Sequence, residues 1–176
     1  GRINIAYRLK IVDAKLRFGE WELDSVIGAK LRGAITSMVE RKNKLTILLL
    51  LDGPASEAIK EGIIRKLTPH KKHVLTLTSD NRKEFSGHTE ISENLGSAFY
   101  FCTPYHSWER GLNEYTNGLV WQYFPKGTGF AKLTAANLQR VEDLLKNRPR
   151  KALDYHSPNE AFAKITTPPK IYALGM

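Results

Sequence analysis

Cysteine is nearly absent from this sequence of 176 residues. The single residue of this type, Cys102, excludes an internal disulfide and a zinc site built from cysteines. It ends the apolar run from Ala98 to Cys102, where a buried and unreactive thiol is expected. A chain that cannot form a disulfide fits a reducing compartment.

Long apolar runs are absent as well. The longest, Ile47 to Leu51, is far too short to cross a membrane. The first residues, Gly1 to Asn4, do not resemble a secretory signal, and no internal repeat stands out. We therefore expect a soluble cytoplasmic protein with no membrane partner.

Acidic residues are fewer than basic ones, 18 against 27, which gives a formal net charge of +9. This balance favours a polyanionic partner, most simply nucleic acid, although a lysine-rich surface is the plainer alternative. The length fits one domain. We expect a basic N-terminal arm at 1–17, a core at 18–165 and a C-terminal tail at 166–176.

The apolar patterning predicts an order of strands and helices. Alternation and β-branched content indicate five strands, at 21–27, 34–40, 44–51, 74–79 and 98–102. Apolar faces and capping residues indicate helices at 57–67, 88–95, 109–124 and 135–146 and a short one after Ser157, with caps at Ser56, Gly96 and Thr134. The order β-β-β-α-β-α-β-α-α predicts an α/β fold, a mixed five-stranded sheet flanked by helices, which is the order of the ribonuclease-H-like fold.

Three carboxylates stand in unusual places. Asp24 interrupts a β-prone run, in which alternation puts Glu22 on the same face. Asp80 ends the fourth predicted strand, and Glu114 lies early in the helix expected at 109–124. In the predicted fold the first and fourth strands are neighbours, and that helix can cross above their ends. Taken singly, each acid is also a plausible turn residue, helix cap or surface residue.

Three converging carboxylates repel one another, and a bound divalent cation reverses that cost. Ligands that are all oxygen suit Mg²⁺ or Mn²⁺. Two such ions can hold a phosphate between them and stabilise the attacking and leaving oxygens. The constellation therefore predicts phosphodiester chemistry on nucleic acid.

From Trp21 to about Phe162 the sequence resembles the integrase-type core of bacterial insertion-sequence transposases, specifically insertion-sequence family thirty, within the retroviral-integrase superfamily. The matching sequence motifs are at 21–28, 39–42, 78–88, 104–128, 147–151 and 157–158, of which 104–128 is the most specific. The separation of Asp80 from Glu114 is also similar to that of this family.

The resemblance implies a catalytic triad of Asp24, Asp80 and Glu114 that binds two Mg²⁺ or Mn²⁺ ions. It implies cleavage of a DNA strand by water, followed by attack of a DNA 3′-hydroxyl on target DNA. The partners would be transposon ends and target DNA, the assembly a homodimer or higher oligomer, and the location the nucleoid of a bacterial cytoplasm.

Three residues differ from those usual in the family's motifs: Arg82 stands in place of glycine, Tyr115 in place of asparagine and Trp121 in place of arginine. A glycine there would suit a turn with positive φ, so Arg82 predicts local strain. These departures keep open a decayed DNA-binding or dimerisation module of the same fold. A nuclease acting on RNA–DNA hybrids is a third hypothesis.

Polar and basic residues around the triad are candidates for DNA contacts. Asn113 and Asn117 flank Glu114 and would orient the carboxylate, contact DNA or simply add polarity to the helix surface. Tyr105 would stack on a base or pack under its loop. The basic candidates for phosphate contacts are Arg110, Lys126, Arg148, Arg150 and Lys151.

Overall fold

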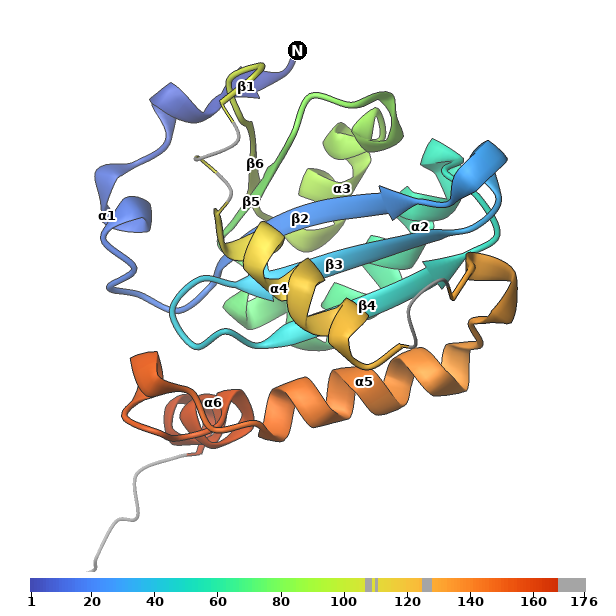
Figure 1. Cartoon of the computed structure of the whole chain (residues 1–176). Helices are drawn as coiled ribbons and strands as arrows, with labels where there is room; N and C mark the ends of the chain where they lie inside the picture. Colours follow the sequence, from blue (N-terminus) through green and yellow to red (C-terminus); the bar gives the residue numbers. More distant parts are fainter. Residues whose placement is uncertain (107–108, 110, 125–127, 168–176) are drawn as a thin grey trace, which may run out of the picture.

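The computed structural model describes residues 1–106, 109, 111–124 and 128–167. A six-stranded mixed sheet runs through the centre of the molecule in the order β1-β6-β5-β2-β3-β4 (Figure 1). The central hairpins β2–β3 and β3–β4 are antiparallel, whereas β2–β5, β5–β6 and β6–β1 are parallel. The strands are β1 (Ile3–Asn4), β2 (Glu20–Ile27), β3 (Ala34–Glu40), β4 (Thr46–Leu51), β5 (Thr76–Ser79) and β6 (Ala98–Phe101).

The predicted mixed sheet and the neighbouring positions of β2 and β5 are confirmed, but the predicted number of strands was wrong. The sixth strand, β1, lies in the segment that was interpreted as a basic arm. It has only two residues, so it carries no alternation that a sequence pattern can reveal. Its partner is β6, in which Tyr100 and Phe101 pair with Ile3 and Asn4.

Helices cover both faces of the sheet. They are α1 (Lys10–Asp13), α2 (Ser56–Leu67), α3 (His88–Leu95), α4 (Gly111–Gln122), α5 (Ala135–Asn147) and α6 (Pro158–Thr166). The caps predicted at Thr134 and Gly96 are confirmed, and Ser157 caps α6. The cap predicted at Ser56 was wrong, because α2 begins one residue earlier than expected and Ala55 is its N-cap.

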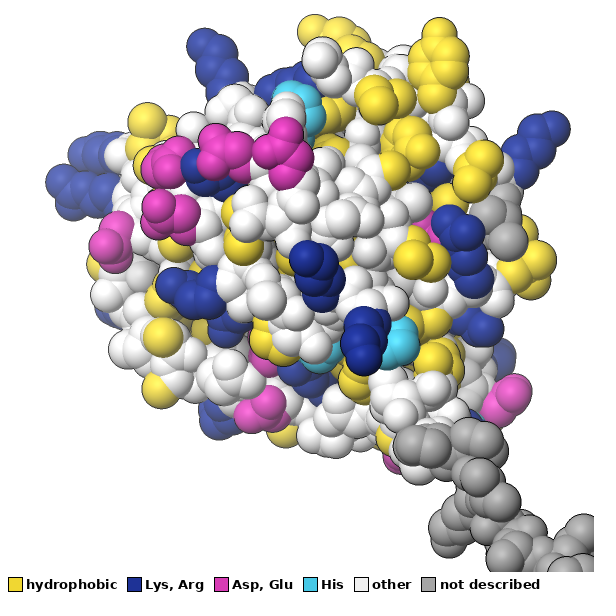
Figure 2. Space-filling model, turned by 180° about the vertical axis from the view of Figure 1, so that it is seen from behind, with side chains coloured by type: hydrophobic (Ala, Val, Ile, Leu, Met, Phe, Trp, Pro, Cys, Tyr) yellow, Lys and Arg dark blue, Asp and Glu magenta, His cyan; other side chains and the backbone are white. Residues whose placement is uncertain are grey.

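The face of the sheet that α2 and α3 cover holds the larger apolar core. Trp21 and Leu23 of β2 point into it and are fully buried. Helix α2 lies very close to β4, since a Cβ at Gly62 would stand 2.3 Å from Leu49 Cδ2. From behind, Figure 2 shows a group of acidic side chains at the upper left and basic side chains scattered over this side.

The opposite face carries α4 and α5 (Figure 1). A second apolar cluster joins Ile35 and Leu48 of the sheet to Leu119 of α4 and Val141 of α5. Helix α5 also covers the edge strand β4, whose Leu48 N–H donates to the buried Glu142 carboxylate at 2.7 Å. That bond occupies a backbone donor on an edge that has no further strand.

Within the described part of the chain, no helix has the length and apolarity that a membrane crossing requires.

Candidate active site

Asp24 lies in the middle of β2, on the face that α4 covers, and is only 8% exposed. Asn117 of α4 donates from Nδ2 to Asp24 Oδ2 at 2.8 Å and accepts from Ser37 Oγ at 3.2 Å. Because Ser37 pairs with Asp24 across β2 and β3, the Asn117 amide holds the helix over both strands. An aspartate disfavoured in a strand is thus accommodated by a specific polar partner.

Asp80 directly follows β5, the parallel neighbour of β2. Glu22 is level with Thr78 in the pairing of these strands, and continuing this register sets Asp80 level with Asp24. Asp80 therefore stands at the carboxyl end of β5, next to the strand that carries Asp24, and the ends of parallel strands are a common place for functional groups in α/β folds.

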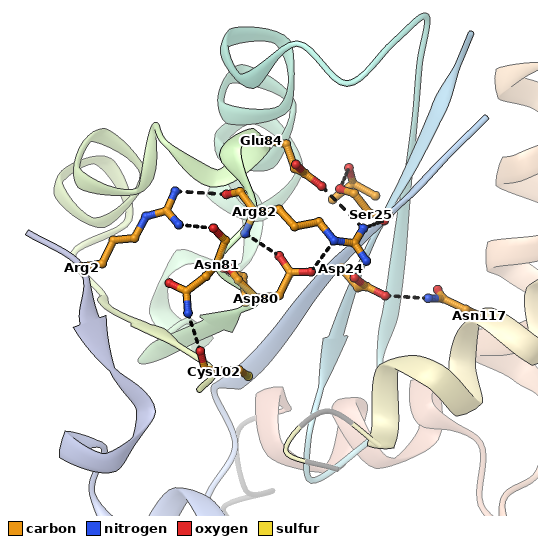
Figure 3. A network of polar contacts seen from close by, with 11 residues as sticks. Arg2, Asp24, Ser25, Asp80, Asn81, Arg82, Glu84, Cys102 and Asn117 are labelled. Carbon is orange, nitrogen blue, oxygen red and sulfur yellow. Dashed lines mark hydrogen bonds and ion pairs between the residues drawn. The ribbon is translucent and has the colours of Figure 1, made fainter. Parts of the chain in front are cut away.

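Arg82 binds the Asp80 carboxylate through both its side chain and its backbone. Its Nε lies 2.9 Å from Asp80 Oδ2, and its backbone N–H donates to Oδ1 at 3.2 Å. Its Nη1 donates to the Ser25 carbonyl of β2 at 2.9 Å and lies 3.7 Å from Glu84. Figure 3 shows the guanidinium group between the Asp80 loop and β2, beside Asp24.

The backbone strain expected at Arg82 is not found. Its φ is −64° and its ψ is 160°, an ordinary extended conformation that any residue adopts. The neighbouring loop is held by Arg2, which donates to the carbonyls of Asn81 and Arg82. Asn81 in turn donates to the Cys102 carbonyl at 2.5 Å. Arg82 is thus a well-accommodated cation beside a carboxylate.

Glu114 lies in the first turn of α4 and is exposed. Among the described residues, no three Asp, Glu, His or Cys side chains stand close enough together to hold a metal ion. The structure therefore brings α4 onto Asp24 through Asn117, while the three predicted carboxylates do not form a ready ligand set.

Buried charges continue along β2 from Asp24. Glu22 is 2% exposed and forms an ion pair with Arg41. Burial raises the pKa of the Glu22 carboxyl, outweighing the opposite influence of the Arg41 and Arg8 guanidinium groups. Arg8 donates to Thr78 at 2.9 Å, so the first turns of the chain contribute to this polar face.

The buried ion pair between Glu22 and Arg41 was not predicted from the sequence. The available signal was the alternation that puts Glu22 on the same face as Asp24, next to the cationic turn that follows β3.

The candidates for DNA contacts have different surroundings. Arg110 and Lys126 lie outside the described residues. Asn113 is fully buried, which contradicts the alternative of helix-surface polarity and leaves it inaccessible to DNA in this structure, and its side-chain amide has no hydrogen-bond partner among the described residues. Arg148, Arg150 and Lys151 line one cavity of about 640 Å³ together with Tyr115.

Aromatic residues near the site differ in exposure. Tyr105 is 99% exposed beside the cavity that Asp80 and Arg82 line, so it does not pack under its loop. Trp121 instead packs against Phe124 and Phe130 in the second apolar cluster. Its position on α4 is therefore structural.

Sequence comparison finds relatives among transposases. The transposase for insertion sequence element IS4351 of Bacteroides fragilis is 44% identical over 165 residues, which cover 94% of this chain and 51% of that protein. Transposase InsI for element IS30C of Escherichia coli K12 is 38% identical over 154 residues, covering 87% of this chain and 40% of InsI. The relatives of this chain are thus transposases of insertion sequences, among them a member of the IS30 family.

The chain spans about half the length of the first of these curated relatives and less of InsI. A scan against protein-family models finds no match.

Solved structures show the same fold at lower sequence identity. A chain of the simian T-cell lymphotropic virus intasome superposes with a TM-score of 0.69 at 16% identity, covering 88% of this chain and 57% of that one. The catalytic core domain of BIV integrase superposes with a TM-score of 0.63 at 20% identity, covering 85% and 96%. The ribonuclease-H-like fold predicted from the strand order is confirmed.

Proposed function

We propose that this chain is a transposase catalytic core that cuts DNA strands and joins DNA 3′-hydroxyls to target DNA in a reaction that needs divalent metal ions. Asp24, Asp80 and Glu114 would hold the ions. The observation that carries the proposal is that Asp24 lies on β2 and Asp80 directly follows β5, the parallel neighbour of β2, with Asn117 of α4 bonded to Asp24.

The donor set suits the ions that the family resemblance implies. Carboxylate oxygens are hard ligands that match Mg²⁺ or Mn²⁺. Arg82 already places a cation against Asp80, which indicates that this end of the sheet attracts positive charge. When bound, the ions would activate the attacking oxygen and stabilise the leaving oxygen of a phosphodiester.

The chain's own residues have separate parts in this proposal. Asn117 orients the Asp24 carboxylate by donating to Oδ2. Tyr105, exposed beside Asp80, offers a ring that can stack on a base next to the cleaved phosphate. Arg82 would compete with a metal ion for Asp80, because its Nε lies 2.9 Å from Oδ2 and both cations are attracted to the same carboxylate.

The direct test is nicking of supercoiled plasmid, and joining of an oligonucleotide to it, in Mg²⁺ or Mn²⁺. Asp80→Asn and Glu114→Gln should abolish both reactions, whereas the matched surface changes Asp143→Asn and Glu93→Gln should leave them intact. Activity that persists in Asp80→Asn contradicts the assignment of the triad.

One observation favours a second candidate, a DNA-binding or dimerisation module without catalysis. Arg82 occupies the Asp80 carboxylate, and the described residues contain no assembled ligand set. This candidate predicts that Mg²⁺ and Mn²⁺ leave the melting temperature unchanged. Stabilisation by the metal ions that disappears in Asp80→Asn would reject it.

A further inference from the structure

A groove runs from α4 to α6 and is formed by two adjoining cavities. The first, of about 640 Å³, lies between Tyr115 of α4 and the segment 148–152. The second, of about 610 Å³, lies between the β3–β4 turn and the segment from Ala152 into α6. Lys44 and Ala152 line both cavities, so the two cavities adjoin each other at these residues.

Cations dominate the lining of these two cavities, which together we call the basic groove. Among its described lining residues, Asp154 is the only carboxylate. Arg41 also lines it, but is already paired with Glu22. The remaining cations are Lys15, Lys42, Lys44, Arg148, Arg150, Lys151 and Lys164.

The side of the molecule covered by α2 and α3 is arranged differently. There Lys60 Nζ lies 2.8 Å from Glu57 and 2.6 Å from Glu90, so the cation is neutralised by its neighbours. Figure 2 shows a group of acidic side chains at the upper left of that side, whereas one carboxylate, Asp154, is found among the described lining residues of the basic groove.

The groove cations are held at an electrostatic cost. Burial and the nearby Lys15 lower the pKa of Lys44 to about 8. Burial and Arg148 lower the pKa of Arg150. In the free protein these side chains donate to backbone carbonyls, Lys44 to Arg41 at 2.6 Å and Arg150 to Leu145 at 3.2 Å. An anion in the groove would relieve the repulsion between the cations.

Three residues that line the groove have a left-handed backbone conformation. Lys15 and Lys44 have φ values of 52° and 61°, in the left-handed region that favours glycine. Asp154 and Tyr155, which follow Ala152, have φ values of 50° and 64°. Strained backbone that persists in a folded protein is commonly found at functional sites.

We propose that the basic groove binds the phosphodiester backbone of duplex DNA where the duplex leaves the catalytic carboxylates. The inference rests on the proposed function for the reacting DNA, because the groove begins at Tyr115, the residue after Glu114. Cations placed in series along two cavities match a polymer of repeating phosphates better than a single small anion. Tyr115, 59% exposed, offers its ring to the sugars at the groove entrance.

The test is equilibrium binding of a fluorescein-labelled DNA duplex, measured by anisotropy in EDTA. The triple variant Arg148→Gln, Lys151→Gln and Lys164→Gln removes three exposed groove cations. We expect its Kd to rise about tenfold or more at moderate salt. The slope of log affinity against log salt should become shallower by about 0.9 for each phosphate that the variant no longer neutralises.

The matched control is Arg65→Gln, Lys71→Gln and Lys72→Gln, which removes one exposed arginine and two exposed lysines outside the groove. We expect its Kd to stay within about twofold of the parent, since it removes equal charge but leaves the groove intact. Equal loss of affinity in both triple variants, or no loss in the groove variant, would overturn the proposal.

The outcome is separable from that of the catalytic proposal. Binding in EDTA requires no metal ion, and Asp80→Asn should bind the duplex as tightly as the parent. Weak binding by the groove variant, together with a parent protein that never nicks DNA, would support the groove and refute the chemistry. A parent that nicks DNA, with unchanged binding in the groove variant, would refute the groove alone.

Discussion

Leu23 and Asp24 are neighbours along one strand, and both are buried, yet they belong to different environments. Leu23 points to the face that α2 and α3 cover, where it packs with Trp21 and Met38. Asp24 points to the face that α4 covers, where its partner is the Asn117 amide. Because side chains alternate along a strand, one short segment supplies both a core and a candidate site.

The two faces also differ in how their burial affects stability. Apolar burial on the α2 and α3 side is favourable by itself. On the α4 side, burial raises the pKa of the Glu22 carboxyl in spite of the Arg41 guanidinium beside it, so these surroundings disfavour the charged form of Glu22. Burial of such a group does not stabilise the fold in the way that apolar burial does.

Leu23→Ala should have the largest effect on stability, because it removes a side chain from the apolar core under α2 and α3. Truncation of a fully buried leucine costs about 2–5 kcal/mol of the free energy of unfolding. Urea denaturation followed by circular dichroism measures this. The control Leu144→Ala, at a leucine that is 40% exposed, should cost clearly less, and equal costs would contradict the assignment of Leu23 to the main core.

Asp24→Asn should abolish the function proposed for the polar face without unfolding the protein. The substituted side chain keeps an oxygen that can accept from Asn117, so the free energy of unfolding should change by no more than about 1 kcal/mol. Loss of a residue that only supports a metal ligand lowers activity by up to about 10²-fold. Asp24 is proposed as a ligand itself, so strand transfer should fall by more than about 10²-fold. Near-normal activity in a folded Asp24→Asn protein would exclude Asp24 from the catalytic group.

Much of this division was predictable from the sequence. The alternation in 21–27 indicated the strand and put Glu22 and Asp24 on one face, and the strand order predicted that β2 and β5 are neighbours. The sequence motifs around Asp80 and Glu114 suggested metal-dependent DNA cleavage and strand transfer, through their resemblance to a known family. These signals are local, or they depend on order along the chain, and both can be read without coordinates.

Other features depend on contacts that no local pattern encodes. Strand β1 has two residues and exists only because Ile3 and Asn4 reach β6. Arg8 meets Thr78, and Arg82 meets the Ser25 carbonyl, across long stretches of sequence. The burial of Asn113 could not be predicted, because the sequence does not reveal which face of the helix lies against the sheet. The basic groove likewise joins the β3–β4 turn to residues after 147.

Lys44 links the polar face to the basic groove, and its ionisation gives a pH test. With a pKa of about 8, Lys44 is charged at pH 7 and mostly neutral at pH 9. Duplex affinity should therefore fall between these values, by about tenfold at most for a single charge. In Lys44→Arg the charge persists, and anisotropy should show a flatter dependence. An identical fall in Lys44→Arg would assign the effect to another group.

The same lowered pKa has a consequence for stability. The unfolded chain binds the Lys44 proton more tightly, so the contribution of this residue to stability should rise as the pH increases from about 8 toward the ordinary lysine value of 10.5. Thermal melts over this window should show the parent gaining stability relative to Lys44→Gln. A parent that loses stability relative to the variant would contradict the assigned shift.

Arg82 provides the smallest and most specific test, at the opposite end of the polar face. Arg82→Gln removes the guanidinium from Asp80 but keeps an extended residue whose backbone N–H still donates to Oδ1. The arginine side chain is half exposed, and an exposed ion pair contributes about 0.2–1 kcal/mol. The midpoint for stabilisation by Mg²⁺ or Mn²⁺ should therefore fall by no more than about fivefold.

The measurement is a thermal melt at increasing metal concentration without DNA, so it does not depend on catalysis. Arg65→Gln, an exposed arginine on α2, controls for the loss of charge alone and should leave the midpoint in place. A lower midpoint in Arg82→Gln that is abolished by adding Asp80→Asn would show that the guanidinium and the metal ion compete for one carboxylate. A midpoint that stays fixed or rises would mean that Arg82 supports this end of the site, in the way that Asn117 supports Asp24.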